Sequence, residues 1–453
     1  MSLSQERIGE TTSYRKTVEK GGTMRYFSFM AALAVLATAS VSCSKTDKIG
    51  PDEPDEPQEQ NPYKPLSLTQ SQKEIVKAGN TFALEFLDKV GAESKGSFVV
   101  SPLSMQFLLG MLVNGAQEET AEEICKVLGY GASESGAVNQ LGYSPSAADA
   151  LNQYSLYMLE NLPKLDKKTT LCLANALWVN KNYPLLSTYK EKMGKFYLAE
   201  VSNMDFSDLA TTSKINQWCS DKTNGLIPKV LDNVSESALA YLMNALYFKS
   251  QWKEKFKKED TSNKPFTDES GNTVQVPMMQ TKKSFMYQDN ETLRAIHLPY
   301  GNGAYAMIVI LPATGKTLSD VTTALKTTNF DSFLASMVPC NADLWLPKFE
   351  TKFHIKLNSI LSDMGMPSSF SPSKANFKAM SDYALCLDFV MQDAIIKVDE
   401  EGTEAAAVST GGMRDTSVSP GQNVTFHADR PFLYLITESS TRAILFAGRY
   451  MGK

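Results

Sequence analysis

Few side chains in this chain of 453 residues are suited to acid–base or nucleophilic chemistry. It has three histidines, His297, His354 and His427. None stands in a Gly-x-Ser-x-Gly or His-Glu-x-x-His pattern, with which hydrolases activate a nucleophile or a metal-bound water. A phosphate-cradling Gly-x-x-x-x-Gly-Lys-Ser/Thr loop is also missing from the sequence. The sequence therefore disfavours a hydrolase, and we interpret His297 and His427, each close to a proline, as structural.

The cysteines do not form a metal-binding pattern. Five of them lie after residue 67, widely spaced and without a Cys-x-x-Cys pair, which argues against a zinc site and gives no disulfide framework. We expect no metal and no cofactor, and we expect most of these cysteines to be small buried apolar residues. A single disulfide among them stays an open alternative for an exported protein. The five are Cys125, Cys172, Cys219, Cys340 and Cys386.

One segment, residues 399–410, combines a single glycine with a run of small side chains and reads DEEGTEAAAVST. A strand-like apolar tract, 394–398, leads directly into it. Alternate side chains of a strand face opposite ways. Such a segment could slide between two strands already in place, because a close-packed interior penalises larger side chains by roughly 1–3 kcal/mol. The alternative is an ordinary surface loop. The face that would turn inward is small and uncharged throughout: Thr403, Ala405, Ala407, Ser409 and Gly411.

Several longer motifs give this segment a context. In their order and spacing they resemble the serpin family, over the range from Leu68 to Lys453. The motifs are FVVSPLSM at 98–105, NGAQEETAEEICKVLG at 114–129, ANALWVN at 174–180, INQWCSDKTNGLIPKVL at 215–231, NALYFKSQW at 244–252, VPMM at 276–279, LPYGNGAYAMIVILP at 298–312, LWLPKFE at 344–350 and DRPFLYLITESSTRAILFAGRY at 429–450.

The resemblance implies an α+β serpin fold. This fold has three β-sheets, a large central and mostly antiparallel sheet A, a shell of about eight or nine helices and an exposed reactive-centre loop, here about 400–429. Local patterns agree with a mixed fold. Apolar spacing predicts an amphipathic helix over 70–90, and Thr120 with Glu123 predicts a capping box for a helix that stops at Gly129. Short apolar runs predict buried strands at 305–311, 432–436 and 443–447.

The resemblance also implies a function. A serpin offers its loop as bait to a serine or cysteine protease, and after cleavage the loop inserts into sheet A while the protease is still acyl-linked to it. The partner is therefore the target protease in a covalent complex, and the inhibitor itself is a monomer and not an enzyme. The alternative is a non-inhibitory serpin that acts as a binding or chaperone-like surface lipoprotein. Such relatives usually carry a bulky or charged residue on the inward face, and the inward-facing residues from Thr403 to Gly411 include none.

Two sets of residues carry the insertion by this resemblance. The polar cluster where strands must part and the tryptophan at the entry point are Ser101, Ser104, Asn244, Gln392 and Trp252, with Gln392 replacing the histidine of many relatives. The alternative for these five is ordinary buried core. The hinge is Glu401, Gly402, Thr403, Glu404, Ala405, Ala406 and Ala407, with Thr403 the first residue to insert.

The scissile bond is less sharply indicated. Counting about fourteen residues beyond the hinge glycine, as in the family, places it at Thr416–Ser417. The stretch from Gly402 to Pro431 is a few residues longer than in typical relatives. The bond after Arg414, which suits trypsin-like proteases, and the bond after Met413, which suits elastase-like or chymotrypsin-like ones, therefore stay open.

The N-terminal residues predict export. Residues 1–23 are a polar leader or follow a misassigned start, and 24–42 have the basic start and short apolar core of a signal peptide. Cys43 resembles the acylated cysteine of bacterial lipoproteins, although Ser40 departs from that pattern, and a plain cleavable signal is the alternative. We expect a bacterial envelope protein, an outer-membrane lipoprotein exposed at the surface, or an extracellular one. Residues 43–67, acidic and rich in proline, predict a tether before the domain at 68–453.

The overall composition excludes other partners. The net charge is −5, charged residues make up 21% and hydrophobic residues 43% of the chain, as in an ordinary soluble domain with a sizeable core. No basic block appears along the sequence. We therefore expect no nucleic acid as a partner, and membrane contact only through the lipid on Cys43.

Overall fold

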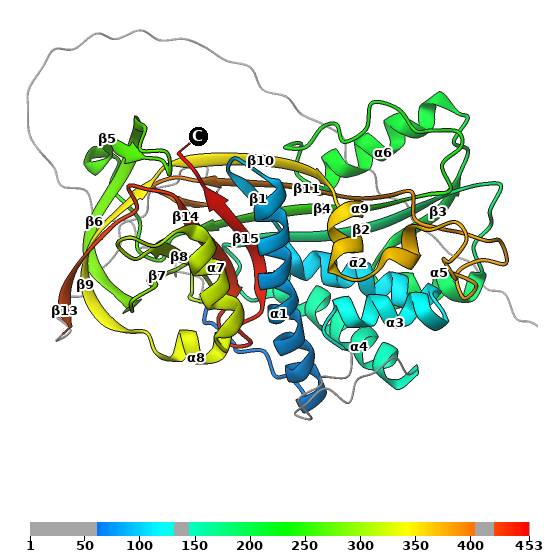
Figure 1. Ribbon diagram of the computed structural model, residues 1–453, viewed down its shortest axis with the longest axis horizontal. Helices are drawn as coiled ribbons and strands as arrows, with labels where there is room; N and C mark the ends of the chain where they lie inside the picture. Colours follow the sequence, from blue (N-terminus) through cyan, green and yellow to red (C-terminus); the bar gives the residue numbers. More distant parts are fainter. Residues whose placement is uncertain (1–60, 131–144, 404–420, 453) are drawn as a thin grey trace, which may run out of the picture. The chain divides into compact units, whose positions relative to one another are not determined.

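A computed structural model of the chain describes residues 61–130, 145–403 and 421–452, and the structural statements below concern these residues. They form helices around two hydrogen-bonded sheets (Figure 1). The α-helices are α1 (Gln70–Glu93), α2 (Pro102–Gly115), α3 (Glu118–Val127), α4 (Pro145–Asn161), α5 (Ser187–Tyr197), α6 (Leu209–Lys222), α7 (Leu318–Thr327), α8 (Phe330–Ala335) and α9 (Asn358–Met364), and the 3₁₀ helices are η1 (Leu162–Lys164), η2 (Lys258–Asp260) and η3 (Pro367–Phe370).

The six-stranded sheet has the order β10-β11-β12-β4-β2-β3. It is mostly antiparallel, since only β2 with β3, and β11 with part of β4, pair in parallel. Its central strands β4 and β11 are mostly apolar and are buried along almost their whole length. The bounds are β2 (Thr170–Asn180), β3 (Glu200–Met204), β4 (Ala240–Gln251), β10 (Phe349–Lys356), β11 (Phe389–Val398) and β12 (Gly402–Thr403).

The nine-stranded sheet has the order β1-β15-β14-β8-β7-β6-β9-β13, with β5 also paired to β6. We expected two smaller sheets here. In this structure they are continuous, because the 17-residue strand β6 pairs with β5, β9 and β7 in turn. The bounds are β1 (Phe98–Val100), β5 (Ser262–Thr267), β6 (Thr273–Asp289), β7 (Leu293–Pro299), β8 (Tyr305–Pro312), β9 (Val338–Pro347), β13 (Gln422–His427), β14 (Phe432–Glu438) and β15 (Ile444–Tyr450).

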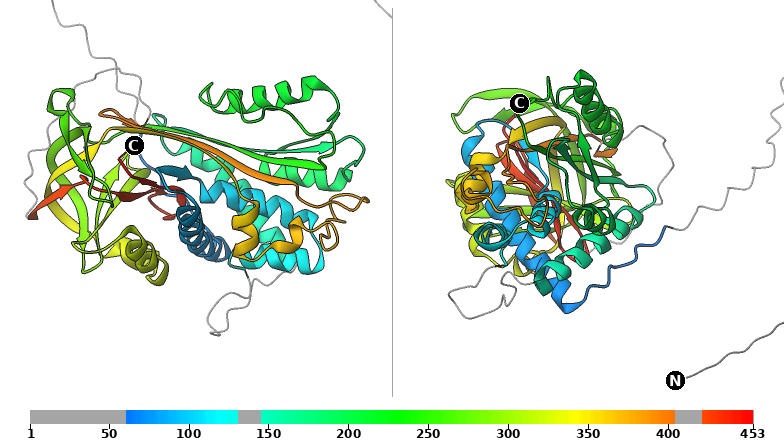
Figure 2. Two further views of the ribbon diagram at one scale, coloured as in Figure 1. Left: turned by 45° about the horizontal axis from the view of Figure 1, so that its top comes forward. Right: turned by 90° about the vertical axis from the view of Figure 1, so that its right-hand side faces the viewer.

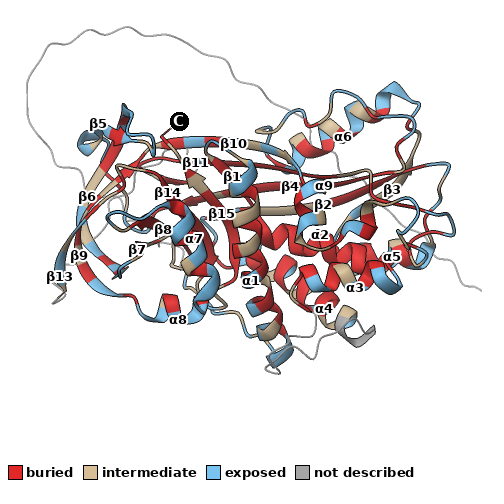
Figure 3. Ribbon diagram, in the orientation of Figure 1, coloured by how far each residue is buried: buried red, intermediate tan, exposed pale blue. Residues whose placement is uncertain are grey.

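Helix α2 lies at the centre of the core. Every residue in it except Asn114 is buried, as expected for a helix that is apolar on all sides (Figure 3). Helix α1 confirms the helix predicted over 70–90 and extends to Glu93, with Thr69 and Gln72 forming its capping box. The strands predicted at 305–311, 432–436 and 443–447 are confirmed as β8, β14 and β15.

The capping box predicted for Thr120 and Glu123 is wrong. Helix α3 begins at Glu118, so Thr120 lies inside the first turn. Its hydroxyl instead accepts the Asn376 N–H at 3.0 Å, and the Glu123 carboxylate accepts the hydroxyl and N–H of Ser368, because η3 packs against this turn. The predicted stop is confirmed, since Gly129 has a φ of +79°.

Helix α6 lies on the face of the six-stranded sheet opposite α2 (Figure 2). Beneath it is a separate apolar cluster in which Trp178 of β2 and Trp218 of α6 meet edge to face, with ring centroids 5.9 Å apart. This cluster attaches α6 to its face of the sheet through apolar packing.

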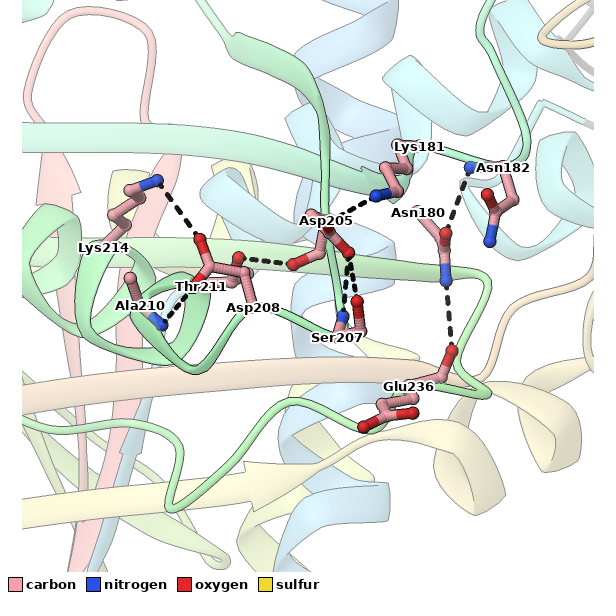
Figure 4. A network of polar contacts seen from close by, with 10 residues as sticks. All are labelled: Asn180, Lys181, Asn182, Asp205, Ser207, Asp208, Ala210, Thr211, Lys214 and Glu236. Carbon is pink, nitrogen blue, oxygen red and sulfur yellow. Dashed lines mark hydrogen bonds and ion pairs between the residues drawn. The ribbon is translucent and has the colours of Figure 1, made fainter.

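The attachment is polar at the N-terminus of α6 (Figure 4). Asp205 follows β3, binds the Lys181 ammonium and accepts the N–H and hydroxyl of Ser207 at 3.1 and 2.6 Å. Its backbone carbonyl accepts the Thr211 hydroxyl at 2.7 Å, and Asp208 caps the helix through the Ala210 N–H. Asp205 thus connects the end of β2 to the first turn of α6.

This connection predicts a pH dependence. Mainly because of Lys181, and secondly Ser207, the pKa of Asp205 is lowered from 3.8 to about 2. Its stabilising effect is therefore present above its unfolded-state pKa and is lost as the pH falls through about 2. We expect Asp205→Asn to lower the melting temperature at neutral pH, and the difference from wild type to disappear toward pH 2 in paired melting curves. A difference that stays constant over this pH range would contradict the assignment.

Among the described helices, none combines the length and the apolar character needed to cross a bilayer.

Candidate functional site

The start of the hinge lies between two strands of the six-stranded sheet. Gly402 and Thr403 form β12, which pairs antiparallel with both β11 and β4, through Thr403 opposite Val398 on one side and Ser250 on the other. Beyond this point β11 pairs directly with β4, over Phe389–Asp393 and Tyr241–Ala245. The sheet is therefore already parted at one end, by two residues.

Thr403 is fully buried, and its hydroxyl lies 2.6 Å from that of Tyr300. We expected Thr403 to be the first residue to insert after cleavage. In the intact chain it has already entered the sheet, because Tyr300 supplies a buried partner for its polar group and its side chain is small. Residues beyond Thr403 in the hinge prediction are outside the described part of the chain.

Gly402 fits this place because it lacks a side chain. A Cβ on it would lie 2.0 Å from the carbonyl oxygen of Ser250, too close for any other residue. The glycine of the hinge motif thus allows the loop backbone to turn from β11 back against β4.

The turn between β11 and β12 is held by Trp252. Its indole N–H donates to the Asp399 carbonyl at 2.8 Å, and its ring stacks on Tyr300 with centroids 4.4 Å apart. The Asp399 carboxylate accepts the Glu401 N–H at 3.0 Å. Trp252 therefore lies beside β12, in contact with Tyr300, which holds Thr403, and its role as the entry-point residue stays a prediction.

Lysines bind the two glutamates of this turn. Glu401 pairs with Lys255 at 2.7 Å and Lys258 at 3.7 Å, and Glu400 pairs with Lys348 at 2.8 Å. The pKa of Glu401 is lowered, chiefly by Lys255. Burial acts to raise the pKa of Glu400, but Lys348 and neighbouring hydrogen-bond donors outweigh it and the pKa is lowered. Glu400 and these lysines were not predicted from the sequence, although the lysine-rich stretch WKEKFKK at 252–258 was an available signal for Lys255 and Lys258.

The predicted polar cluster is brought together where β11 and β4 pair directly. Gln392 of β11 is opposite Asn244 of β4, with Gln392 Nε2 3.5 Å from Asn244 Oδ1. Gln392 also accepts the Ser101 N–H at 2.8 Å and donates to the Ser101 carbonyl at 3.1 Å, while Asn244 donates to the Ser104 hydroxyl. Asn175 of β2, which the sequence analysis missed, accepts from Asn244 at 2.9 Å. The cluster thus ties both strands to the start of α2.

Gln392→Leu is expected to lower the free energy of unfolding by about 1–3 kcal/mol, because the buried N–H and carbonyl of Ser101 lose their partner. Equilibrium denaturation measures this change. The control is Gln217→Leu on the exposed face of α6, expected to change stability by less than about 0.5 kcal/mol. Equal effects of the two substitutions would show that the cluster does not stabilise the closed sheet.

The histidines and cysteines do not converge on one site. His297 lies in β7, where burial lowers its pKa, His354 bonds Asp393 at 2.6 Å, and His427 stacks on Trp345 with ring centroids 3.7 Å apart. The five described cysteines are unpaired, and four of them are buried. Within the described residues, the histidines and cysteines do not form a pair of nucleophile and base.

The remaining predicted site residues lie outside the described part of the chain, and their roles stay predictions. They are Glu404, Ala405, Ala406 and Ala407 of the hinge, Met413, Arg414, Thr416 and Ser417 around the scissile bond, and Cys43.

Comparison with known proteins agrees with this geometry. Residues 77–452 match the family model described as Serpin (serine protease inhibitor). An uncharacterised serpin-like protein of Thermococcus kodakarensis is 31% identical over 385 residues, 84% of this chain and 86% of that protein. The leukocyte elastase inhibitor of Xenopus laevis is 33% identical over 385 residues, 82% and 97% of the two chains. The native crystal structure of the thermophilic serpin tengpin superposes with a TM-score of 0.75 at 27% identity, covering 87% of this chain and 97% of that one. The predicted fold is confirmed.

Proposed function

Because this chain belongs to the serpin family of protease inhibitors, we propose that it is an inhibitory member, which traps a serine or cysteine protease as a covalent acyl-enzyme. The observation that supports the proposal is β12. Its two residues, Gly402 and Thr403, pair antiparallel with both β11 and β4, and a loop inserted along the same line would continue this pairing.

Inserting the loop would change the strand pairings of the sheet in a favourable direction. Continuing β12 along the sheet would replace the single parallel pairing of β11 with β4 by two antiparallel pairings, one on each side of the loop. Parallel pairing is slightly less stable per residue than antiparallel pairing. The intact loop cannot complete this exchange because both its ends are held, by β11 and by β13. Cleavage frees the end that carries the acyl-linked protease.

The polar cluster opposes premature insertion. Gln392 and Asn244 must separate before the loop can pass between them, and each is bonded to buried groups at the start of α2. Strand separation thus has a cost while the loop is intact, and the cut loop offsets it with new hydrogen bonds along two strands. The protease, attached to the moving end, is carried along and its catalytic site is distorted before the acyl bond is hydrolysed.

For location, we propose that the chain is exported and anchored in a bacterial envelope through a lipid on Cys43, with the domain a monomer. The tether predicted at 43–67 then ends before Asn61, because Asn61, Tyr63, Leu66 and Ser67 are bonded to the domain. Support comes from the sequence of 24–43 alone. Labelling cells with a palmitate analogue tests this proposal, since Cys43→Ser must remove the label.

The experiment that tests inhibition uses the chain from Ser44 onward. It is incubated with trypsin, elastase, chymotrypsin, subtilisin and papain, and the products are separated on denaturing gels. A denaturant-stable band with the mass of chain plus protease is the expected result, and the mass of the released C-terminal peptide identifies the scissile bond. Cleavage without such a band for every protease that cuts within 404–420 would instead support the non-inhibitory alternative.

A further inference from the structure

Residues 61–69, just before α1, lie along the domain as a segment without helix or strand, which we call the N-terminal strap (blue in Figure 2, right). Residues 61–67 were predicted to belong to the tether, which is wrong for this part because the folded domain binds it. Its side chains and backbone are bonded to distant parts of the chain: Asn61 Nδ2 to Asp166 at 2.6 Å, Tyr63 Oη to Glu438 at 2.9 Å, Leu66 N to Ser440 at 3.0 Å and Ser67 N to Tyr157 at 3.0 Å.

Asp166, the partner of Asn61, is 1% exposed and precedes β2. The donors that reach its carboxylate are neutral. Asn61 and the Lys168 N–H bind Oδ1 at 2.6 and 2.9 Å, and the Thr169 hydroxyl binds Oδ2 at 2.9 Å. A buried carboxylate depends strongly on each such donor, so the strap is part of what keeps Asp166 in place.

Asp166 lies close to both residues that hold Thr403, namely Ser250 and Tyr300. On one side, the Thr169 hydroxyl is 2.6 Å from that of Ser250, the residue opposite Thr403 on β4. On the other side, Asp166 packs against the turn that follows Tyr300. A Cβ on Gly301 would lie 1.9 Å from Asp166 Oδ2, and the Asn302 amide donates to the Leu165 carbonyl at 2.8 Å.

The second anchor of the strap is Glu438 of β14, which lies against the same 300–305 turn. Glu438, at the end of β14, is fully buried and is opposite Tyr305 in the sheet. It accepts Tyr63, and the pKa of Tyr63 is raised to about 12, first by burial and then by Glu438. The next residue, Ser439, donates to the carbonyls of Ala304 and Gly303.

The strap therefore bridges two parts of the domain that must move relative to each other. Strands β2 and β4 pair over ten residues and must part from β11 as one unit when the loop inserts. Asp166 belongs to the start of that unit, whereas Glu438 and the 300–305 turn belong to the nine-stranded sheet. A strap bonded to both sides opposes their separation.

From this arrangement we infer that the N-terminal strap restrains loop insertion, with Asp166 as the positioning residue that transmits its docking to Thr403. The inference rests on the proposed function for its consequence, since a restrained insertion sets how fast a protease is trapped. The structural part of the inference does not depend on protease trapping. With the strap docked, β12 stays paired between β11 and β4, and with the strap released this end of the sheet opens more often.

The test compares the whole chain with Asn61→Leu, Tyr63→Phe and the double variant by hydrogen–deuterium exchange. Peptides that cover 399–403 are expected to exchange on the order of tenfold faster in the double variant, because two hydrogen bonds to buried carboxylates are lost. Peptides from β14 and β15 serve as the internal reference. Asn233→Leu, an exposed position with the same change of residue, is the matched control. Exchange at 399–403 equal to that of the control overturns the inference.

A thermodynamic cycle tests the route through Asp166. Asp166→Ala removes both oxygens that could accept the Asn61 hydrogen bond. If Asn61 acts through Asp166, the exchange rate at 399–403 in the double variant Asn61→Leu/Asp166→Ala equals that of Asp166→Ala alone, whereas multiplied effects reject this route. The exchange readout does not require trapping. A chain that never forms a stable protease complex but shows these rates would refute the proposed function while supporting the strap.

Discussion

Thr403→Arg is expected to convert the protein from an inhibitor into a substrate. Thr403 is fully buried between β11 and β4, with its hydroxyl 2.6 Å from that of Tyr300. An arginine there would bury an unpaired charge, which costs several kcal/mol. We therefore expect the variant to fold with β12 displaced from the sheet, to be cut by the protease as fast as wild type, and to release it without a stable complex.

The measurement is the fraction of protease converted to a denaturant-stable complex at fixed molar ratio. Two controls separate charge from other effects. Thr403→Val keeps the shape and removes only the hydroxyl, so it should still trap, and Thr323→Arg places the same new charge on the exposed face of α7 and should behave as wild type. An unchanged yield of complex from Thr403→Arg would refute insertion through this residue.

Cleavage of the reactive loop is expected to raise the melting temperature strongly. Once cut, the loop is free to complete the strand that β12 begins and to hydrogen-bond with β11 and β4 along their length. About 1 kcal/mol shifts the melting temperature of domains of 150–250 residues by roughly 2–4 °C. A new central strand adds several times this free energy, so we expect the melting temperature to rise by several times that roughly 2–4 °C shift.

The measurement is calorimetry on intact chain and on chain cut once within 404–420. The matched control is cleaved Thr403→Arg, in which the loop is cut but insertion is blocked, so its melting temperature should stay that of the intact variant. If the wild-type chain melts at the same temperature before and after a clean cut, the intact fold is not the less stable state and the proposed mechanism fails.

Local patterns in the sequence were sufficient to predict several of the helices and strands. The apolar spacing over 70–90 predicted α1, the short apolar runs predicted β8, β14 and β15, and Gly129 ended α3 as expected, because helices and buried strands follow from side-chain periodicity over a few residues. The capping box predicted for Thr120 and Glu123 was wrong because the contacts of these residues are not local. Thr120 and Glu123 are bonded to Asn376 and Ser368, partners far along the chain that local spacing cannot anticipate.

By itself the sequence determined the family, through motifs spread over 98–450, and it predicted a small-residue hinge that begins at the glycine. The tertiary structure alone decided that Thr403 already lies inside the sheet, since this depends on Ser250 and Tyr300, each at least a hundred residues away in the chain. The same holds for the contact of Asn61 with Asp166, 105 residues apart. Such contacts arise when strands from separate parts of the chain align in one sheet. Their energies depend on burial and geometry that no local pattern contains.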